Sequence, residues 1–189
     1  LLGADTDVIT YSGATYTGNA TIALTSTGLG NAAAEDITVT TGAGADTVTV
    51  TCASWVGAAG ASSGITIATG AGADTITMTH GNLLATTGGT QSITAGTGAD
   101  TITKVGTNDT TATALTTFVI ADGDSTVAGR DKITGFDAGD GTDRSDILDL
   151  STGTAQGNTA GTDGTDSGTI KSHAIAAGII TFDDVNTFT

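Results

Sequence analysis

Three copies of one short turn carry the residue types in this chain that best suit metal-ligand chemistry. Each copy reads Gly-x-Gly-x-Asp, at residues 42–46, 70–74 and 96–100. Glycine tolerates positive φ and has no Cβ, so backbone carbonyl groups can point inward at such a turn. Carbonyl and carboxylate oxygens are the ligands that a hard cation such as Ca²⁺ prefers. A tight turn in which Asp caps the backbone uses the same residue types, but Asp at the same phase of every clear copy favours a cation.

The segments around each turn alternate apolar residues with threonine, as strands with one buried face do. Strands are expected to enter the turns from Ile37, Ile65 and Ile93, and each turn is followed by Thr-Val-Thr or Thr-Ile-Thr. The turn aspartates are separated by 28 and then 26 residues, and Asp124 follows 24 residues later. Self-similarity at such a period is the signature of a solenoid. The pattern predicts an all-β fold, a right-handed parallel β-helix with calcium-binding turns on one edge.

Stacked turns would place like charges above one another, at Asp46, Asp74, Asp100 and Asp124. Strands in a sheet lie about 4.8 Å apart, and two carboxylates at that spacing repel by roughly 3–4 kcal/mol at an effective dielectric near 20. Such a ladder is unfavourable unless cations lie between its rungs. We therefore expect calcium binding to be coupled to folding, so that the coils repel where calcium is scarce and stack where it is abundant.

Composition limits the other functions open to the chain. It has 189 residues, a net charge of −15, 29 glycines and no proline. Acidity of this degree argues against binding to nucleic acid or an anionic membrane, and no apolar stretch is long enough to span a membrane. The single cysteine, Cys52, excludes an internal disulfide. His80 and His173 lack the spacing of zinc ligands, and no nucleophile elbow or phosphate loop occurs, so we expect no enzyme activity.

The turns resemble the nonapeptide repeat of RTX proteins, Gly-Gly-x-Gly-x-Asp-x-hydrophobic-x, which residues 41–49 match except for Thr41 at the first position. The acidic stretch 131–150 looks like the segment that closes RTX β-rolls. The resemblance covers roughly residues 36–151 and implies that calcium binds between successive coils. It assigns this role to Gly42, Gly44, Asp46, Gly70, Gly72, Asp74, Gly96, Gly98, Asp100, Asp122 and Asp124. It assigns a further site near the closing segment to Asp137, Asp140, Asp143, Asp146 and Asp149.

The acids of the closing segment lie in a glycine-rich setting, which favours metal ligation over a glycosidase-type pair of carboxylates. The spacing of the turns departs from the usual RTX repeat of nine residues, because one calcium-type turn recurs per 24–28 residues and the opposite corners lack Asp. In this respect the chain looks more like the RTX-type surface-layer proteins of Gram-negative bacteria. We expect a calcium-binding solenoid at residues 1–151, a flexible linker at 152–168, and at 169–189 the start of a C-terminal element, a β-hairpin followed by a helix, of a longer protein.

The resemblance implies a structural function for this chain. The expected role is a calcium-stabilised solenoid that assembles into a surface layer or extracellular lattice on a bacterial cell, after export by a type I pathway. Self-association is the expected interaction, and any anchoring to cell-surface polysaccharide would involve parts of the protein outside these residues. Two alternatives stay open: an RTX adhesin, and the export and folding domain of a larger secreted RTX enzyme.

Overall fold

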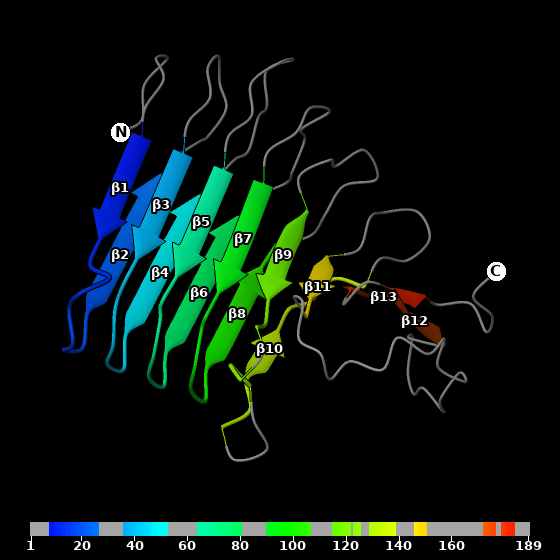
Figure 1. Cartoon of the computed structure of the whole chain (residues 1–189). Helices are drawn as coiled ribbons and strands as arrows, with labels where there is room; N and C mark the ends of the chain where they lie inside the picture. Colours follow the sequence, from blue (N-terminus) through cyan, green and yellow to red (C-terminus); the bar gives the residue numbers. More distant parts are fainter. Residues whose placement is uncertain are drawn as a thin grey trace.

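The computed structural model describes residues 8–26, 36–52, 64–80, 90–106, 115–121, 123–125, 129–138, 146–150, 172–176 and 179–183. These residues form an all-β fold of two sheets (Figure 1). The first sheet contains, in spatial order, β1 (Val8–Ser12), β3 (Asp36–Thr40), β5 (Gly64–Ala68), β7 (Thr90–Thr94), β9 (Thr116–Val119), β11 (Ile147–Asp149), β13 (Ile179–Asp183) and β12 (Ser172–Ala176). The second contains, in spatial order, β2 (Thr21–Ser26), β4 (Thr47–Cys52), β6 (Thr75–His80), β8 (Thr101–Val105) and β10 (Lys132–Thr134).

From β1 to β11, successive strands of the chain alternate between the two sheets, and each strand from β1 to β9 pairs in parallel with the strand two places further on. The pairing is in register, so that Ile37 lies opposite Ile65 and Val48 lies opposite Ile76. A chain that visits two sheets in turn and always advances by one strand spacing is a β-solenoid. The predicted parallel solenoid is therefore confirmed. The turns between the first and the second sheet lie along one edge of the stack (Figure 1).

The core lies between the two sheets and is built by the period-two alternation of the strands. Apolar residues point inward because successive side chains of a strand point to opposite faces, and threonines occupy most of the outward positions. The inward columns are narrow, since each strand contributes at most three buried apolar side chains. The buried apolar residues are Ala20, Ile37, Val39, Val48, Val50, Cys52, Ile65, Ile67, Ile76, Met78, Ile93, Ala95, Ile102 and Phe118.

The C-terminal strands pair with the first sheet. β11 pairs in parallel with β9, with Leu148 opposite Phe118. β12 and β13 form an antiparallel hairpin, and β13 also pairs antiparallel with β11. The linker predicted at 152–168 lies outside the described residues. Within the described residues, no helix has the length and apolar character needed to cross a membrane.

Candidate metal centre

The turns between the sheets stack on one another through their backbones. Ala71 forms parallel bridges to Ala43 on one side and to Thr97 on the other. The carbonyl oxygen of Gly42 accepts a hydrogen bond from the Ala71 amide at 3.0 Å, and that of Gly70 accepts one from the Thr97 amide at 2.9 Å. These carbonyl groups therefore hydrogen-bond to the next coil, whereas the sequence had led us to expect them to point inward at a cation.

The turn aspartates form a column in which each carboxylate contacts the coil before it. Asp46 Oδ1 accepts a hydrogen bond from the Ala20 amide at 2.7 Å, Asp74 Oδ1 from the Asp46 amide at 2.8 Å, and Asp100 Oδ1 from the Asp74 amide at 2.8 Å. The sequence left open that each turn aspartate caps a backbone amide. The aspartates do cap amides, but the capped amides belong to the neighbouring coil. Each aspartate connects two turns of the solenoid.

The next rung of the column is Asp131, and the prediction that Asp124 would follow Asp100 is wrong. Asp131 Oδ1 accepts a hydrogen bond from the Asp100 amide at 3.1 Å. Asp131 immediately precedes β10, whose residue Lys132 pairs with Thr101 just after Asp100. The sequence carried a signal for this, because the Asp-x-Ile-Thr that begins at Asp131 also begins at Asp74 and Asp100. We call Asp46, Asp74, Asp100 and Asp131 the aspartate column.

One oxygen of every carboxylate in the aspartate column lacks a hydrogen-bond partner in the part of the chain that the structure describes. Asp46, Asp74 and Asp100 are each 1% exposed. Their Oδ2 atoms, and that of Asp131, are buried without a hydrogen-bond partner among the described residues. No described Lys or Arg forms an ion pair with them. A buried carboxylate oxygen that is neither paired nor hydrogen-bonded is costly, so the column needs a positive charge or a proton.

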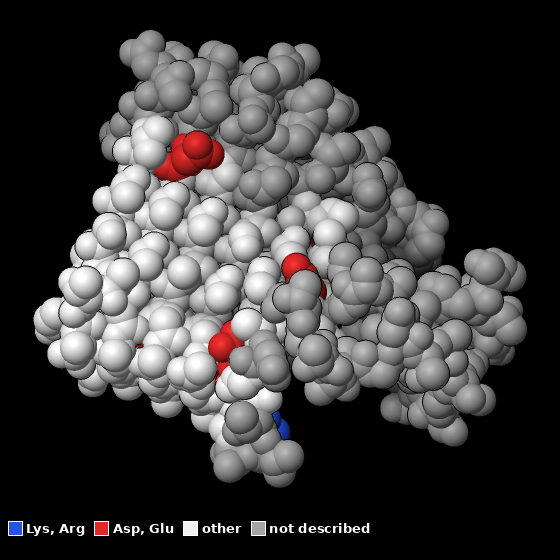
Figure 2. Space-filling model, viewed as in Figure 1, with Lys and Arg blue, Asp and Glu red and all other residues white. Residues whose placement is uncertain are grey.

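The raised pKa values of three aspartates in the column also indicate that their negative charges are unfavourable. Burial raises the pKa of Asp100 to about 6; the hydrogen bond from the Asp74 backbone opposes this shift, and the nearby charges of Asp131, Asp74 and Asp124 add to it. Burial likewise raises the pKa values of Asp74 and Asp131. Most of the described surface in Figure 2 is uncharged despite the net charge of −15. Part of the acidity is held inside the stack, where a cation would neutralise it.

Of the acids assigned to the closing segment, the structure describes Asp137, Asp146 and Asp149, and no three acids among the described residues form a group that could hold a metal ion. Asp124, which was assigned to the turns, is 8% exposed, and its Oδ2 accepts a hydrogen bond from the Ala121 amide at 2.8 Å. Asp149 lies in β11, and its carbonyl oxygen accepts a hydrogen bond from the Ile120 amide at 2.8 Å. Asp137 and Asp146 contact one another through the backbone, since Asp146 N donates to Asp137 O at 2.7 Å. The other predicted ligands, Asp122, Asp140 and Asp143, lie outside the described residues.

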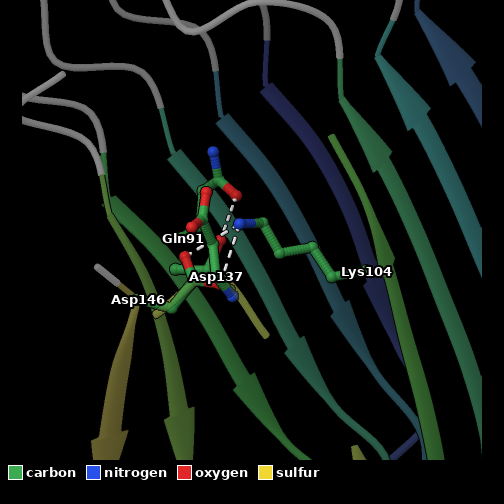
Figure 3. A network of polar contacts seen from close by, with 5 residues as sticks. Gln91, Lys104, Asp137 and Asp146 are labelled. Carbon is green, nitrogen blue, oxygen red and sulfur yellow. Dashed lines mark hydrogen bonds and ion pairs between the residues drawn. The ribbon is translucent and has the colours of Figure 1, made fainter. Parts of the chain in front are cut away.

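Asp146 has a counter-ion within the chain. Lys104 Nζ lies 2.8 Å from both Oδ1 and Oδ2 of Asp146, and both side chains are fully buried. The Asp137 amide also donates to Asp146 Oδ2, at 2.9 Å. Figure 3 shows the Lys104 ammonium group pointing from β8 toward Asp137 and Asp146. Because Lys104 already neutralises Asp146, we leave Asp146 out of the proposed metal site.

Sequence reasoning missed Lys104, although its position carried a signal. Lys104 pairs with Met78 in the register of the second sheet, and Met78 pairs with Val50. It therefore occupies an inward position that is apolar in the two preceding coils. A charged residue at an inward position indicates a partner inside the solenoid, and that partner comes from a segment 42 residues further along the chain.

The oxygen-only donor set of the aspartate column fits a hard cation such as Ca²⁺ in chemical type. The turn glycines contribute less than expected, because the carbonyls of Gly42 and Gly70 are hydrogen-bonded to the next coil. No three His, Cys, Asp or Glu side chains of the described residues converge on one point. A cation in the column would thus be held by the Oδ2 atoms of neighbouring rungs, and would supply positive charge to offset their repulsion.

No family model, curated protein or solved structure matches this chain. The resemblance to RTX repeats and surface-layer proteins therefore stays a prediction from the sequence.

Proposed function

We propose that this chain is a structural module of a bacterial cell-surface protein, and that calcium is required for its coils to stack. The observation that carries the proposal is the aspartate column, in which every rung buries one carboxylate oxygen that has no hydrogen-bond partner among the described residues. Because these oxygens lie inside the stacked coils, a cation would enter as the coils come together. Its binding free energy would then contribute to folding. The extracellular setting, where calcium is abundant, follows from the resemblance to RTX proteins.

The fold supports a structural role for the module. A solenoid grows by adding coils, and each coil contacts only its neighbours. The resulting rod presents two long parallel sheets, which suits assembly into a lattice. We propose that copies of the chain associate with one another at the cell surface, with calcium stabilising each copy.

The first test measures the far-UV circular dichroism and thermal unfolding of the full chain, in calcium and after chelation. We expect the strand signal to weaken and the unfolding temperature to fall on chelation. A ligand at 100 times its Kd stabilises a protein by about 2.7 kcal/mol. An unchanged spectrum and unfolding temperature after chelation would contradict the calcium proposal.

Matched variants locate the effect in the column. Asp74→Asn removes one charge from the column but keeps a side-chain oxygen that can accept the hydrogen bond from the Asp46 amide. Asp36→Asn removes one charge from the outer face of the first sheet, at the start of β3. We expect Asp74→Asn to reduce the calcium-dependent shift in unfolding temperature, and Asp36→Asn to leave that shift unchanged. Electron microscopy of the calcium-loaded protein tests lattice formation separately, since dispersed single rods would contradict it.

A further inference from the structure

The outer face of the second sheet is an array of threonines in three rows. The rows follow from the register of the parallel strands, which places residues of the same phase directly above one another. The first row contains Thr21, Thr47, Thr75, Thr101 and Lys132. The second contains Ala23, Thr49, Thr77, Thr103 and Thr134. The third contains Thr25, Thr51, Thr79 and Val105. We call these rows the threonine face.

The outer face of the first sheet repeats threonine continuously only in its central row, which reads Thr10, Thr38, Thr66, Ser92 and Thr117. Its flanking rows differ in size, polarity and charge from coil to coil, and include Val8, Ser12, Asp36, Gly64, Ala68 and Val119. Both sheets have the same parallel geometry and the same demand for strand-forming residues. Strand propensity alone therefore does not explain why threonine dominates all three rows of the threonine face but only the central row of the first sheet.

The threonine face is also nearly free of charge. Among the described outward positions of β2, β4, β6, β8 and β10, the one charged side chain is Lys132, at the end of the first row. A face kept only for solubility commonly contains charged residues, and this chain has 20 acidic residues to place. The threonine face lacks aromatic, methionine and arginine side chains, which anchor most protein interfaces. A neutral, repetitive partner fits it better than a second protein does.

Its spacing suits a lattice of water. Neighbouring positions within a row are about 4.8 Å apart, the distance between adjacent strands, and neighbouring rows are about 6.6 Å apart, the length of two residues along a strand. Two hydrogen bonds of about 2.75 Å that meet at a tetrahedral water separate the outer oxygens by about 4.5 Å, which is close to the spacing across the strands. Each threonine presents one hydroxyl and one methyl group, and its χ1 is restricted by β-branching. The array is therefore ordered before binding, which lowers the entropic cost of association. Figure 1 shows β4, β6 and β8 lying side by side with little twist.

We propose that the threonine face binds ice. Its hydroxyl groups occupy positions continuous with the water lattice, and its methyl groups exclude mobile water from the contact. This binding is separate from the calcium proposal, because the outward threonines and the buried aspartates are on different sides of the second sheet's backbone. The role would be adhesion to ice or control of its growth at the cell surface.

The test compares uptake into slowly growing ice for the full chain and two matched variants. Thr77→Lys changes the centre of the threonine face on β6, and Thr38→Lys changes the equivalent central position on β3 in the first sheet; both threonines are half-buried. We expect wild type and Thr38→Lys to enter the ice fraction and to depress the freezing point below the melting point. We expect Thr77→Lys to lose most of both effects, with an unchanged circular dichroism spectrum.

Thr49→Lys, in the neighbouring strand of the same row, replaces Thr77→Lys if the latter fails to fold, and the same loss is expected. Exclusion of the wild-type protein from ice, as complete as for an unrelated globular protein, would overturn the proposal. Equal losses in Thr77→Lys and Thr38→Lys would also overturn it. So would a change of oligomeric state on Thr77→Lys, because that would identify the threonine face as an interface between copies of this chain.

Discussion

At the residue scale, the aspartates of the column have two different oxygens. Oδ1 of each accepts an amide hydrogen bond from the preceding coil, which fixes the height of one turn above the next. Oδ2 is buried, and no described residue forms a hydrogen bond with it. The first contact explains why Asp suits this position even in the absence of a metal. The burial of Oδ2 makes the negative charge of each aspartate unfavourable, which would not apply to a neutral Asn. This unfavourable charge is the reason to propose a cation.

The raised pKa of Asp100 predicts a stability that depends on pH when calcium is removed. Its pKa is about 6 in the folded chain, compared with an ordinary value of 3.8. Between these values the folded state binds a proton that the unfolded state does not, so protonation stabilises the fold. That stability is fully present below about pH 4 and is lost as the pH rises through about 6. In chelator, the unfolding temperature should be higher at pH 4.5 than at pH 7.

The variant Asp100→Asn tests which group is responsible. Without a titratable carboxyl at this position, the difference between pH 4.5 and pH 7 should shrink, whereas Asp36→Asn should preserve it. An unfolding temperature in chelator that rises from pH 4.5 to pH 7 would contradict the assignment to Asp100.

At the element scale, the turns are built so that backbone lies directly on backbone. Gly70 has a φ of 93°, a conformation that residues other than glycine adopt only at a cost. A Cβ at Gly70 would also overlap the carbonyl oxygen of Gly42 in the preceding coil. The glycines of the turns therefore serve close stacking of the coils in addition to turn geometry.

Two glycine substitutions separate these effects. Gly123 has a φ of 88°, but a Cβ there would meet no atom within 4 Å. We expect Gly123→Ala to lower the free energy of unfolding by about 1–2 kcal/mol, from backbone strain alone. Gly70→Ala adds overlap with the neighbouring turn, so we expect a loss of roughly 3 kcal/mol or more. Urea unfolding measures both, and equal losses would show that the stacking contact contributes little.

At the scale of the whole molecule, the solenoid interior changes character toward its C-terminal end. The inward positions of the earlier coils are mostly apolar, with Ser26 and His80 as exceptions, whereas Gln91, Lys104 and Thr116 are buried in the later coils. Thr116 Oγ1 donates to Gln91 Oε1 at 2.8 Å, and Lys104 pairs with Asp146. The buried ion pair connects β8 in the second sheet to the residue that precedes β11 in the first. It therefore ties the last part of the stack to the earlier coils.

Removing one member of the ion pair should loosen this end of the molecule. Lys104→Met continues the column formed by Val50 and Met78 but leaves Asp146 buried without its counter-ion. Breaking a buried pair in this way costs about 3–5 kcal/mol, which chemical unfolding would detect. The double variant Lys104→Met with Asp146→Asn should recover much of the lost stability, because neither buried charge of the pair remains. The Asn side-chain oxygen can also still accept the hydrogen bond from the Asp137 amide. A Lys104→Met protein as stable as wild type would show that the pair does not hold this end.

The sequence by itself determined the parallel solenoid, the strands beside its turns, and the column positions of Asp46, Asp74 and Asp100. These follow from local rules: alternation of apolar residues and threonine, glycine at turns, and a period of 26–28 residues that brings equal phases into register. Only the tertiary structure decided that Asp131 and not Asp124 continues the column, since the insertion before β10 breaks the period. It also decided that the Gly42 and Gly70 carbonyls bond to the next coil, and that Lys104 neutralises Asp146. Those outcomes depend on contacts that the period of 26–28 residues does not specify. Asp131 and Asp146 lie in segments outside the regular repeat, and the carbonyl hydrogen bonds depend on how closely the turns stack.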